Sequence, residues 1–307
     1  MGVSAVVKNT DTLIERAGEI TDKPPAREMD MLLSTGEQVS VALMAMAVHS
    51  LGYKAISLTG AQIGIRTDST HTKARIKAIS SERMQTALDD GNIVIAAGFQ
   101  GTDERLNITT LGRGGSDTTA VALAAVLGAD VCEISTDLDG VYTTDPRLLP
   151  EARMVPQVSY DEMLELASLG AGVMHNRAVE FAKKYHVPIH VRSSFSDTPG
   201  TIIGKAPESD EQPVSGAALE RNGARVTVIG VPDQPGASLE ICSRIAERNI
   251  AVDMIVQNVG AAGRADISFT VVRDELPATL EAVERSAEKL GAEGVTFDDQ
   301  VAKVSVV

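Results

Sequence analysis

Segment 111–117, LGRGGSD, places one arginine between glycines directly before an apolar run that is typical of a helix. Glycines at such a point let backbone N–H groups approach a ligand, and the N-terminus of a helix carries partial positive charge. Arg113 adds a planar donor that can hold a carboxylate through two hydrogen bonds. The segment therefore predicts a binding site for a carboxylate. The alternative is a tight strand-to-helix turn in which Ser116 caps the helix and Asp117 lies in its first turn.

A second polar segment, 135–147 (STDLDGVYTTDPR), follows a β-rich run. Ligands of open α/β folds bind at the carboxyl ends of strands, so Thr136 and Asp137 are candidate ligand contacts. Tyr142 could contact a nucleotide base, and Arg147 could reach its phosphates. The alternative is a long polar loop that binds nothing.

A third segment, STGEQ at 34–38, precedes an apolar stretch. Glu37 could accept hydrogen bonds from the ammonium group of a substrate. The alternative is a helix start in which Ser34 or Thr35 is the cap and Glu37 lies in the first turn.

Helix-like and strand-like segments alternate along the first two-thirds of the chain. The expected strands and helices are, in chain order, helix 36–52, strands 54–59 and 92–99, helix 118–128, strand 131–136, helices 160–170 and 176–186, and strand 187–195. This alternation predicts an α/β domain with a largely parallel sheet.

The composition changes at 204–214, which is polar, acidic and contains two prolines. We therefore expect one domain over 1–205, a linker over 206–214 and a second domain over 215–307. The second domain reads as βαββαβ, the ferredoxin-like arrangement. Its last segment, VAKVSVV, is expected to be an additional edge strand that has no partner strand.

The composition also limits the partners of the chain. Its 307 residues favour two domains. The formal net charge of −14 and the absence of Trp argue against nucleic acid as a partner. Two cysteines in apolar segments are typical of buried thiols in a reducing cytosol, and no apolar run approaches the roughly 20 residues of a membrane span. We expect a cytoplasmic protein without a membrane partner. The histidines have no metal-ligand spacing, so the metal ligands stay unknown.

Taken together, STGEQ, RTDSTHTKARI, AGFQG, ITTLGRGGSDTTA, TDLDGVYTTDPR and VPDQPG…VDMIVQN resemble the aspartate kinases of the amino acid kinase family in order and spacing. The tail resembles a regulatory ACT domain. The resemblance implies a three-layer α/β sandwich with a mostly parallel central sheet, followed by an ACT domain. It also implies transfer of the γ-phosphoryl group of ATP to the β-carboxylate of L-aspartate, the first step toward lysine, threonine and methionine.

The resemblance also implies roles for the residues above. Catalysis would involve Arg113 and Asp117, with Asp117 orienting a phosphate-binding lysine or the shell of the metal. The substrate would contact Glu37, Phe99, Arg113, Gly114, Gly115 and Ser116. ATP, with Mg²⁺ bridging its phosphates, would contact Thr136, Asp137, Tyr142 and Arg147. Because an aspartate side chain is ionised at neutral pH, the reaction needs no general base.

In the ACT region, the resemblance implies that lysine or threonine binds at Asp233, Gly236, Ser238, Asp253 and Gln257. It also implies a homo-oligomer formed through ACT domains. The alternative for PDQPGAS is a simple turn and helix start.

Three departures from the family pattern stand out: Gly172 occupies a position where many relatives carry a lysine, and the other two concern the ends of the chain. The family begins with a strand and a KFGG(T/S)S segment whose lysine contacts the transferred phosphate, and this motif is absent here. We therefore expect a chain that lacks this strand and phosphate loop and that has little activity by itself. VAKVSVV is expected to be the opening strand of a second ACT unit. Two alternatives remain open: an inactive amino-acid sensor that binds an intact kinase, and a kinase for glutamate derivatives.

Overall fold

The computed structural model describes residues 1–6, 9–112, 114–170, 173–205, 214–259 and 263–307. The described chain forms two compact units. The first contains Met1–Ala217 together with Val307, and the second contains Ala218–Val306. Of the expected linker, residues 206–213 lie outside the described residues.

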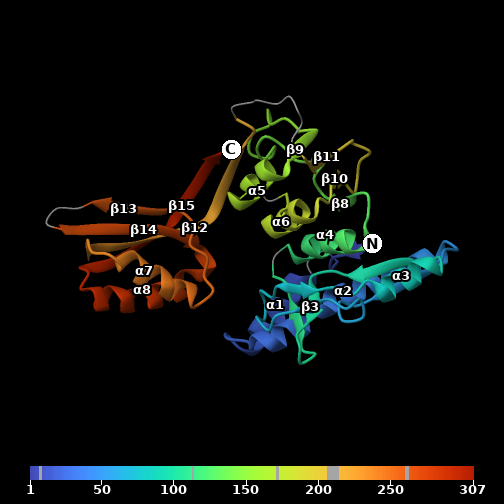
Figure 1. The fold of residues 1–307 in the computed structure, drawn as a ribbon, viewed down its shortest axis with the longest axis horizontal. Helices are drawn as coiled ribbons and strands as arrows, with labels where there is room; N and C mark the ends of the chain where they lie inside the picture. The colour runs from blue at the N-terminus through green and yellow to red at the C-terminus, as the bar shows by residue number, and fades with distance from the viewer. Residues whose placement is uncertain (7–8, 113, 171–172, 206–213, 260–262) are drawn as a thin grey trace. The chain divides into compact units, whose positions relative to one another are not determined.

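The first unit is a mixed α/β structure in which most strand pairs are parallel, as expected (Figure 1). One sheet has the order β1-β5-β2, a second β8-β10-β11-β9 and a third β4-β3-β6-β7. The strands are β1 (Gly2–Val3), β2 (Ala55–Leu58), β3 (Arg66–Thr67), β4 (Ile76–Ala78), β5 (Ile93–Ala97), β6 (Gln100–Thr102), β7 (Ile108–Thr110), β8 (Cys132–Thr136), β9 (Gln157–Ser159), β10 (Ile189–Ser193) and β11 (Thr201–Gly204).

The helices of the first unit are α1 (Asn9–Ile20), α2 (Ala26–Ser50), α3 (Glu82–Asp89), α4 (Gly115–Leu127), α5 (Tyr160–Ser168) and α6 (Asn176–Tyr185). Helices α4, α5 and α6 pack with β8, β10 and β11 around one apolar core, which includes Met163, Val179 and Ile189. A parallel strand covered on both faces needs apolar residues in succession, and β5 fits this rule because Val94–Ala97 are all buried.

Helix α2 begins ten residues earlier than expected. It runs from Ala26, after Pro25, to Ser50, so the expected cap at Ser34 or Thr35 is wrong. Both hydroxyls lie inside the helix and donate to carbonyls three residues earlier, Ser34 to Met31 at 2.8 Å and Thr35 to Leu32 at 2.7 Å. These bonds occupy the hydroxyl donors within the helix.

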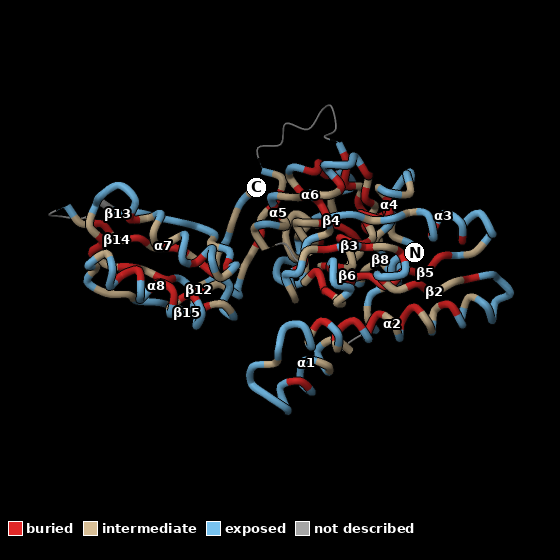
Figure 2. Tube along the Cα trace, turned by 60° about the horizontal axis from the view of Figure 1, so that its bottom comes forward, coloured by how far each residue is buried: buried red, intermediate tan, exposed pale blue. Residues whose placement is uncertain are grey.

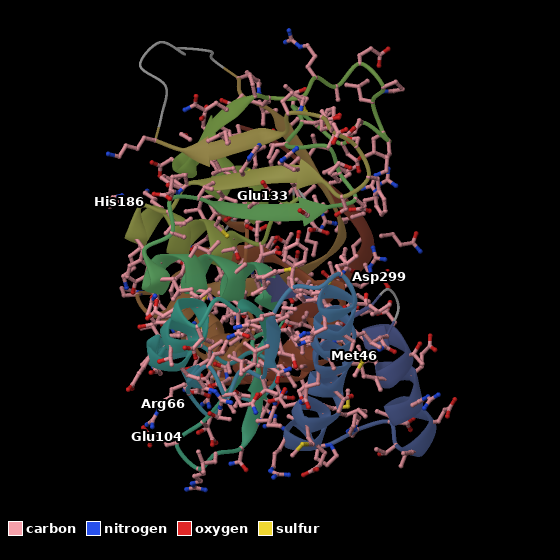
Figure 3. All side chains as sticks on the ribbon, turned by 90° about the vertical axis from the view of Figure 1, so that its right-hand side faces the viewer. Met46, Arg66, Glu104, Glu133, His186 and Asp299 are labelled. Atoms are coloured by element: carbon pink, nitrogen blue, oxygen red, sulfur yellow. The ribbon has the colours of Figure 1, made fainter. Side chains whose placement is uncertain are left out.

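By length and composition alone, α2 is also the one helix in the described part of the chain that could cross a membrane. No continuous apolar run of this length was expected, and α2 contains none, because STGEQ at 34–38 interrupts its apolar residues. Buried residues recur along the helix in Figure 2, and this face packs on β2, β5 and β7. Met46, labelled in Figure 3, belongs to the exposed side of α2.

The second unit has the expected βαββαβ order. It consists of β12 (Ala217–Pro232), α7 (Ala237–Ala246), β13 (Ile255–Val259), β14 (Arg264–Val272), the 3₁₀ turn Arg273–Glu275, α8 (Leu276–Leu290) and β15 (Gly294–Val306). The sheet order is β13-β14-β12-β15, and both helices lie on one face of the sheet (Figure 1). Their apolar sides form a core with the sheet that includes Ile241, Phe269 and Val283.

The final segment of the chain is not a separate unpaired strand. Residues 301–306 continue β15, which is hydrogen-bonded to β12. Val307 exchanges backbone hydrogen bonds with Gly216, at 2.9 and 3.1 Å. The expectation of an edge strand without a partner is therefore wrong, because the strand after α8 is longer than the short GVTF segment that the sequence suggested.

Candidate active site

The glycine-rich segment connects β7 to α4. Gly112 and Gly114 have left-handed φ angles of 79° and 66°, which glycine adopts at little cost. Gly114 is the N-cap of α4, and no side chain caps the helix. The expected cap from Ser116 is wrong, because Ser116 Oγ donates to Ser4 Oγ at 3.2 Å. A helix start without a side-chain cap keeps N–H groups available for an anion. Arg113, between the two glycines, lies outside the described residues.

Close packing around this segment explains why glycines occur there. A Cβ on Gly115 would lie 2.8 Å from Phe99 Cδ2 and 2.9 Å from Leu111 Cβ. Phe99 itself has a φ of 67°, a conformation that costs a non-glycine residue free energy. Its carbonyl accepts from Leu111 N at 2.9 Å, and its N–H donates to Thr119 Oγ1 at 3.1 Å. Phe99 therefore lies against the glycine-rich segment, and its contact with the substrate stays a prediction.

The start of α6 supplies two residues that the sequence analysis did not single out. A Cβ on Gly114 would lie 2.1 Å from the Cβ of His175, the N-cap of α6. Arg177 Nη1 donates to the carbonyl of Leu111 at 3.0 Å. Burial lowers the pKa of His175, and the Arg177 charge adds to this effect. His175 precedes an apolar helix, so the sequence could have identified it as a cap. Its contact with Gly114, about sixty residues earlier, could not be predicted from neighbouring residues.

Asp117 lies in the first turn of α4, as expected. It is half-buried, and burial raises the pKa of its carboxyl group, an effect opposed by a hydrogen bond from the backbone of His175. The carboxylate thus links the first turn of α4 to the start of α6, beside the glycine-rich segment.

Glu37 is buried on the inner side of α2, with 3% of its surface exposed. Its Oε2 atom has no hydrogen-bond partner in the part of the chain that the structure describes. Burial raises the pKa of this carboxyl group to about 7, although a hydrogen bond from the backbone of Ala5 opposes the shift. A buried carboxylate oxygen without a partner is costly, so this atom is a strong acceptor for a cationic ligand.

The four candidate ATP contacts lie at the end of β8 and in the loop that follows. Thr136 ends β8, and its Oγ1 donates to Asp137 Oδ1 at 3.0 Å. Tyr142 is half-buried and forms an isolated bridge with Met154.

Arg147, the fourth of these contacts, extends into solvent with 74% of its side chain exposed. Its Nε and Nη2 atoms donate to both carboxylate oxygens of Asp145. Asp145 raises the pKa of Arg147, and Asp137 adds a smaller effect of the same sign. The structure therefore brings Asp137 and Arg147 into one polar region.

The second unit contains a cavity of about 340 Å³ at the start of α7. Its lining includes four of the five expected effector contacts: Asp233, Gly236, Ser238 and Gln257. Ser238 Oγ donates to Gln257 Oε1 at 3.2 Å, so the two side chains already lie together. The fifth residue, Asp253, does not line this cavity, and its carboxylate pairs with Lys303.

Comparisons with known proteins agree with this architecture. The amino acid kinase family matches residues 3–193, and the ACT domain matches residues 225–288. An aspartate kinase of Pseudomonas putida is 51% identical over 307 residues, which cover 99% of this chain and 75% of the relative.

Two solved structures of E. coli aspartokinase III are also similar. The complex with aspartate and ADP (R-state) has a TM-score of 0.81 and 26% identity, and the complex with lysine and aspartate (T-state) has a TM-score of 0.70 and 27% identity. Each match covers 98% of this chain and 67% of the other. The family match spans more than half of the chain and the relative is 51% identical, so the chain belongs to the amino acid kinase family, among the aspartate kinases that carry a C-terminal ACT domain.

Proposed function

We propose that the first unit binds L-aspartate between Glu37 and the glycine-rich segment and phosphorylates its β-carboxylate with ATP. The observation that carries this proposal is the buried Oε2 atom of Glu37, which has no partner among the described residues. The ammonium group of an amino acid supplies both the charge and the donors that this atom needs. Ionisation of Glu37 then becomes favourable when the substrate binds.

The α-carboxylate of aspartate binds at the start of α4. The uncapped helix start offers the backbone N–H groups of Gly114 and Ser116, while that of Gly115 donates to the carbonyl of Gly112 at 3.0 Å, and Arg113 adds a forked donor beside them. Phe99, held against Gly115, closes one side of this site. An amino acid held at both its ammonium and its carboxylate has its side chain pointed in one direction, which is the positioning that phosphoryl transfer requires.

The polar region at the end of β8 binds ATP through Thr136, Asp137, Tyr142 and Arg147. E. coli aspartokinase III, which is similar in structure, was solved with aspartate and ADP. Arg147 must exchange its contact with Asp145 for phosphate oxygens, and its high exposure permits this movement. The β-carboxylate is already ionised, so these residues align two anions and need not remove a proton.

Mg²⁺ is the metal that fits the donors present. No group of three or more His, Cys, Asp or Glu side chains that could hold a metal ion occurs among the described residues. Mg²⁺ commonly binds through one or two carboxylates and the phosphates of the substrate, and Asp117 and Asp137 are carboxylates of this kind. The ion would neutralise charge on the phosphates during transfer.

The second unit binds an amino-acid effector in the cavity lined by Asp233, Gly236, Ser238 and Gln257. Asp233 suits an ammonium group, and the N-terminus of α7 suits a carboxylate. Lysine is the leading candidate, because the similar E. coli enzyme was solved with lysine in its T-state, and threonine is the second. Exposed Met254, Ile255 and Val256 on and beside edge strand β13 support association of two such units in the cytoplasm.

The test is an assay of purified chain with aspartate, ATP and Mg²⁺, in which β-aspartyl phosphate is trapped as a hydroxamate. Glu37→Gln should raise the KM for aspartate roughly tenfold or more, because a charge-assisted hydrogen bond is lost, and should leave the KM for ATP unchanged. Glu28→Gln is the matched control, since Glu28 is an exposed residue of the same helix. Little activity is expected of a chain without the KFGG(T/S)S segment, whereas this proposal requires measurable transfer, so a wild-type chain that forms no hydroxamate would contradict the proposal.

A further inference from the structure

Asp30 is a fully buried carboxylate on α2, with no exposed surface, and the proposed chemistry does not use it. It accepts four hydrogen bonds from three residues. His71 Nδ1 lies 2.6 Å from Oδ2, Thr110 Oγ1 lies 2.6 Å from Oδ1, and the N–H of Thr72 lies 3.0 and 3.1 Å from the two oxygens. A buried charge of this kind is tolerated only when its acceptors are satisfied, and here they are.

Two of these donors belong to segments that support the glycine-rich segment. Thr110 is the last residue of β7, two positions before Gly112. Thr72 has a left-handed φ of 66°, a conformation that its bond to Asp30 stabilises. The carbonyl oxygen of Thr72 lies 3.0 Å from the position of a Cβ on Gly112, so the two backbones are in contact. Asp30 therefore connects α2 both to the end of β7 and to the backbone at Thr72, which contact the glycine-rich segment on two sides.

Asp30 and Glu37 are seven residues apart on α2, and both are buried. Seven residues are close to two helical turns, so both side chains leave the same side of the helix, about 10 Å apart along its axis. One rigid helix thus holds the proposed ammonium acceptor and a brace for the proposed carboxylate site. The positions of these two sites relative to the nucleotide determine which side-chain length places its carboxylate at the terminal phosphorus.

We infer that Asp30 is a positioning residue that fixes the glycine-rich segment relative to Glu37 through His71, Thr72 and Thr110, and thereby selects aspartate over the longer glutamate. This inference rests on the proposed function of the same site. One methylene in a rigid pocket changes the discrimination between two substrates roughly 10- to 200-fold. When the carboxylate of Asp30 is removed, the glycine-rich segment can move relative to Glu37. Both the affinity for aspartate and the discrimination against glutamate then decrease.

The principal variant is Asp30→Asn, which keeps the size of the side chain but presents an NH₂ group to at least one donor. We expect the KM for aspartate to rise tenfold or more, the KM for ATP to change less than twofold, and the preference for aspartate over glutamate in kcat/KM to fall at least fivefold. Amide hydrogen exchange at residues 110–115 should become faster. These changes separate a positioning role from a general loss of stability.

Asp103→Asn is the matched control. Asp103 is also a buried carboxylate, and it accepts from the N–H groups of Arg105 and Asn107 and from Asn107 Nδ2, but it lies in the turn between β6 and β7, at the other end of β7. Its loss should lower stability and leave the aspartate-to-glutamate preference unchanged. An equal loss of preference in Asp103→Asn would overturn the inference.

A second pair of variants keeps the test decisive if Asp30→Asn does not fold. Thr110→Val removes one donor to Asp30, and Thr110→Ser retains it, so the KM for aspartate should rise in the first and return toward the wild-type value in the second. An unchanged KM and preference in folded Asp30→Asn or Thr110→Val would overturn the inference. A wild-type chain without aspartate phosphorylation would contradict the proposed function alone. The Kd for aspartate, measured by calorimetry on the same variants, would then decide the inference, and an unchanged Kd would overturn it.

Discussion

Gly114 and His175 are in such close contact that a Cβ on the glycine would lie 2.1 Å from the Cβ and 2.4 Å from the Cγ of the histidine. The contact joins the N-cap of α4 to the N-cap of α6, two helices that are far apart in the sequence. His175 also donates from its backbone to Asp117, in the first turn of α4. The glycine-rich segment is thus held from the α6 side by backbone and side-chain contacts.

Replacement of Gly114 by alanine should disrupt this junction. The alanine would have to adopt a left-handed backbone conformation, at a cost of roughly 1–2 kcal/mol. Its Cβ would also overlap the Cβ of His175 and displace that side chain. We expect Gly114→Ala to lower the free energy of unfolding by more than 2 kcal/mol and to raise the KM for aspartate. Gly128→Ala is the control, because Gly128 has a φ of 63° at the other end of α4 and no atom within 4 Å of its Cβ position. Equal destabilisation by both variants, measured by urea unfolding, would contradict the role of His175.

The raised pKa of Glu37 gives the stability of the chain a specific dependence on pH. Burial raises this pKa from 4.5 to about 7, so folding favours the protonated carboxyl group. The favourable contribution is fully present below pH 4.5 and is lost as the pH rises through about 7. Above pH 7 the carboxylate of Glu37 is ionised in both states, buried in the folded chain and solvated in the unfolded chain. There it lowers the free energy of unfolding by about 3 kcal/mol relative to a neutral side chain.

Glu37→Gln should therefore be more stable than the wild type at pH 8, by up to about 3 kcal/mol, and the difference should shrink at pH 5. Because the other carboxylates titrate alike in both proteins, their contributions cancel when the two free energies of unfolding are subtracted. Because the chain contains no Trp, urea unfolding is best followed by far-UV circular dichroism. Glu28→Gln, on the exposed side of the same helix, should give no comparable trend. A difference that is the same at pH 5 and pH 8 would argue against a raised pKa.

Ser159 and Glu162 form a capping box at the start of α5. Ser159 Oγ accepts from Glu162 N at 3.1 Å, and a carboxylate oxygen of Glu162 accepts from Ser159 N at 3.0 Å. Ser159→Ala should lower the free energy of unfolding by about 1 kcal/mol. Ser81→Ala is the matched control, since Ser81 is the N-cap of α3 but makes no side-chain cap bond. If the two variants had equal effects, the box at α5 would contribute nothing.

Local signals in the sequence were sufficient to locate the glycine-rich segment. Its glycines mark a turn between a β-rich run and an apolar helix, and the structure has β7, left-handed Gly112 and Gly114, and α4 in this order. The βαββαβ order of the second unit was also predictable, because each of its elements has a clear apolar period. These features depend on residues that are neighbours in the sequence.

Other features depend on contacts that the sequence does not display. The start of α2 was placed too late because Ser34, Thr35 and Gly36 read as a helix start. In the fold, Gly36 lies where a Cβ would be 3.1 Å from the Cβ of Ala5, so a glycine inside the helix is explained by packing. Asp30 had no local signal at all, since its partners lie about forty and eighty residues away.

The cavity at the start of α7 also combines features that neighbouring residues predict with features that depend on distant contacts. PDQPGAS signalled a turn before a helix, and its residues line the cavity together with Gln257. Asp253, only four residues earlier than Gln257, pairs instead with Lys303, because residues 301–306 continue β15. The sequence of residues 253–257 therefore could not show that Gln257 lines the cavity and that Asp253 does not.

Effector binding in this cavity can be tested by thermal unfolding with 10 mM lysine or threonine. A ligand at one hundred times its Kd stabilises the folded form by about 2.7 kcal/mol, which corresponds to a rise of several degrees in Tm. Gln257→Ala should remove most of this rise, because it deletes a side chain that lines the cavity and holds Ser238.

Asp253→Asn serves as the control for this measurement, since its side chain lies outside the cavity lining and loses only an exposed ion pair worth less than about 1 kcal/mol. We expect it to keep the full ligand-dependent rise in Tm. If Asp253→Asn abolished the rise and Gln257→Ala preserved it, the effector would bind on the β15 side of this unit and not at the start of α7.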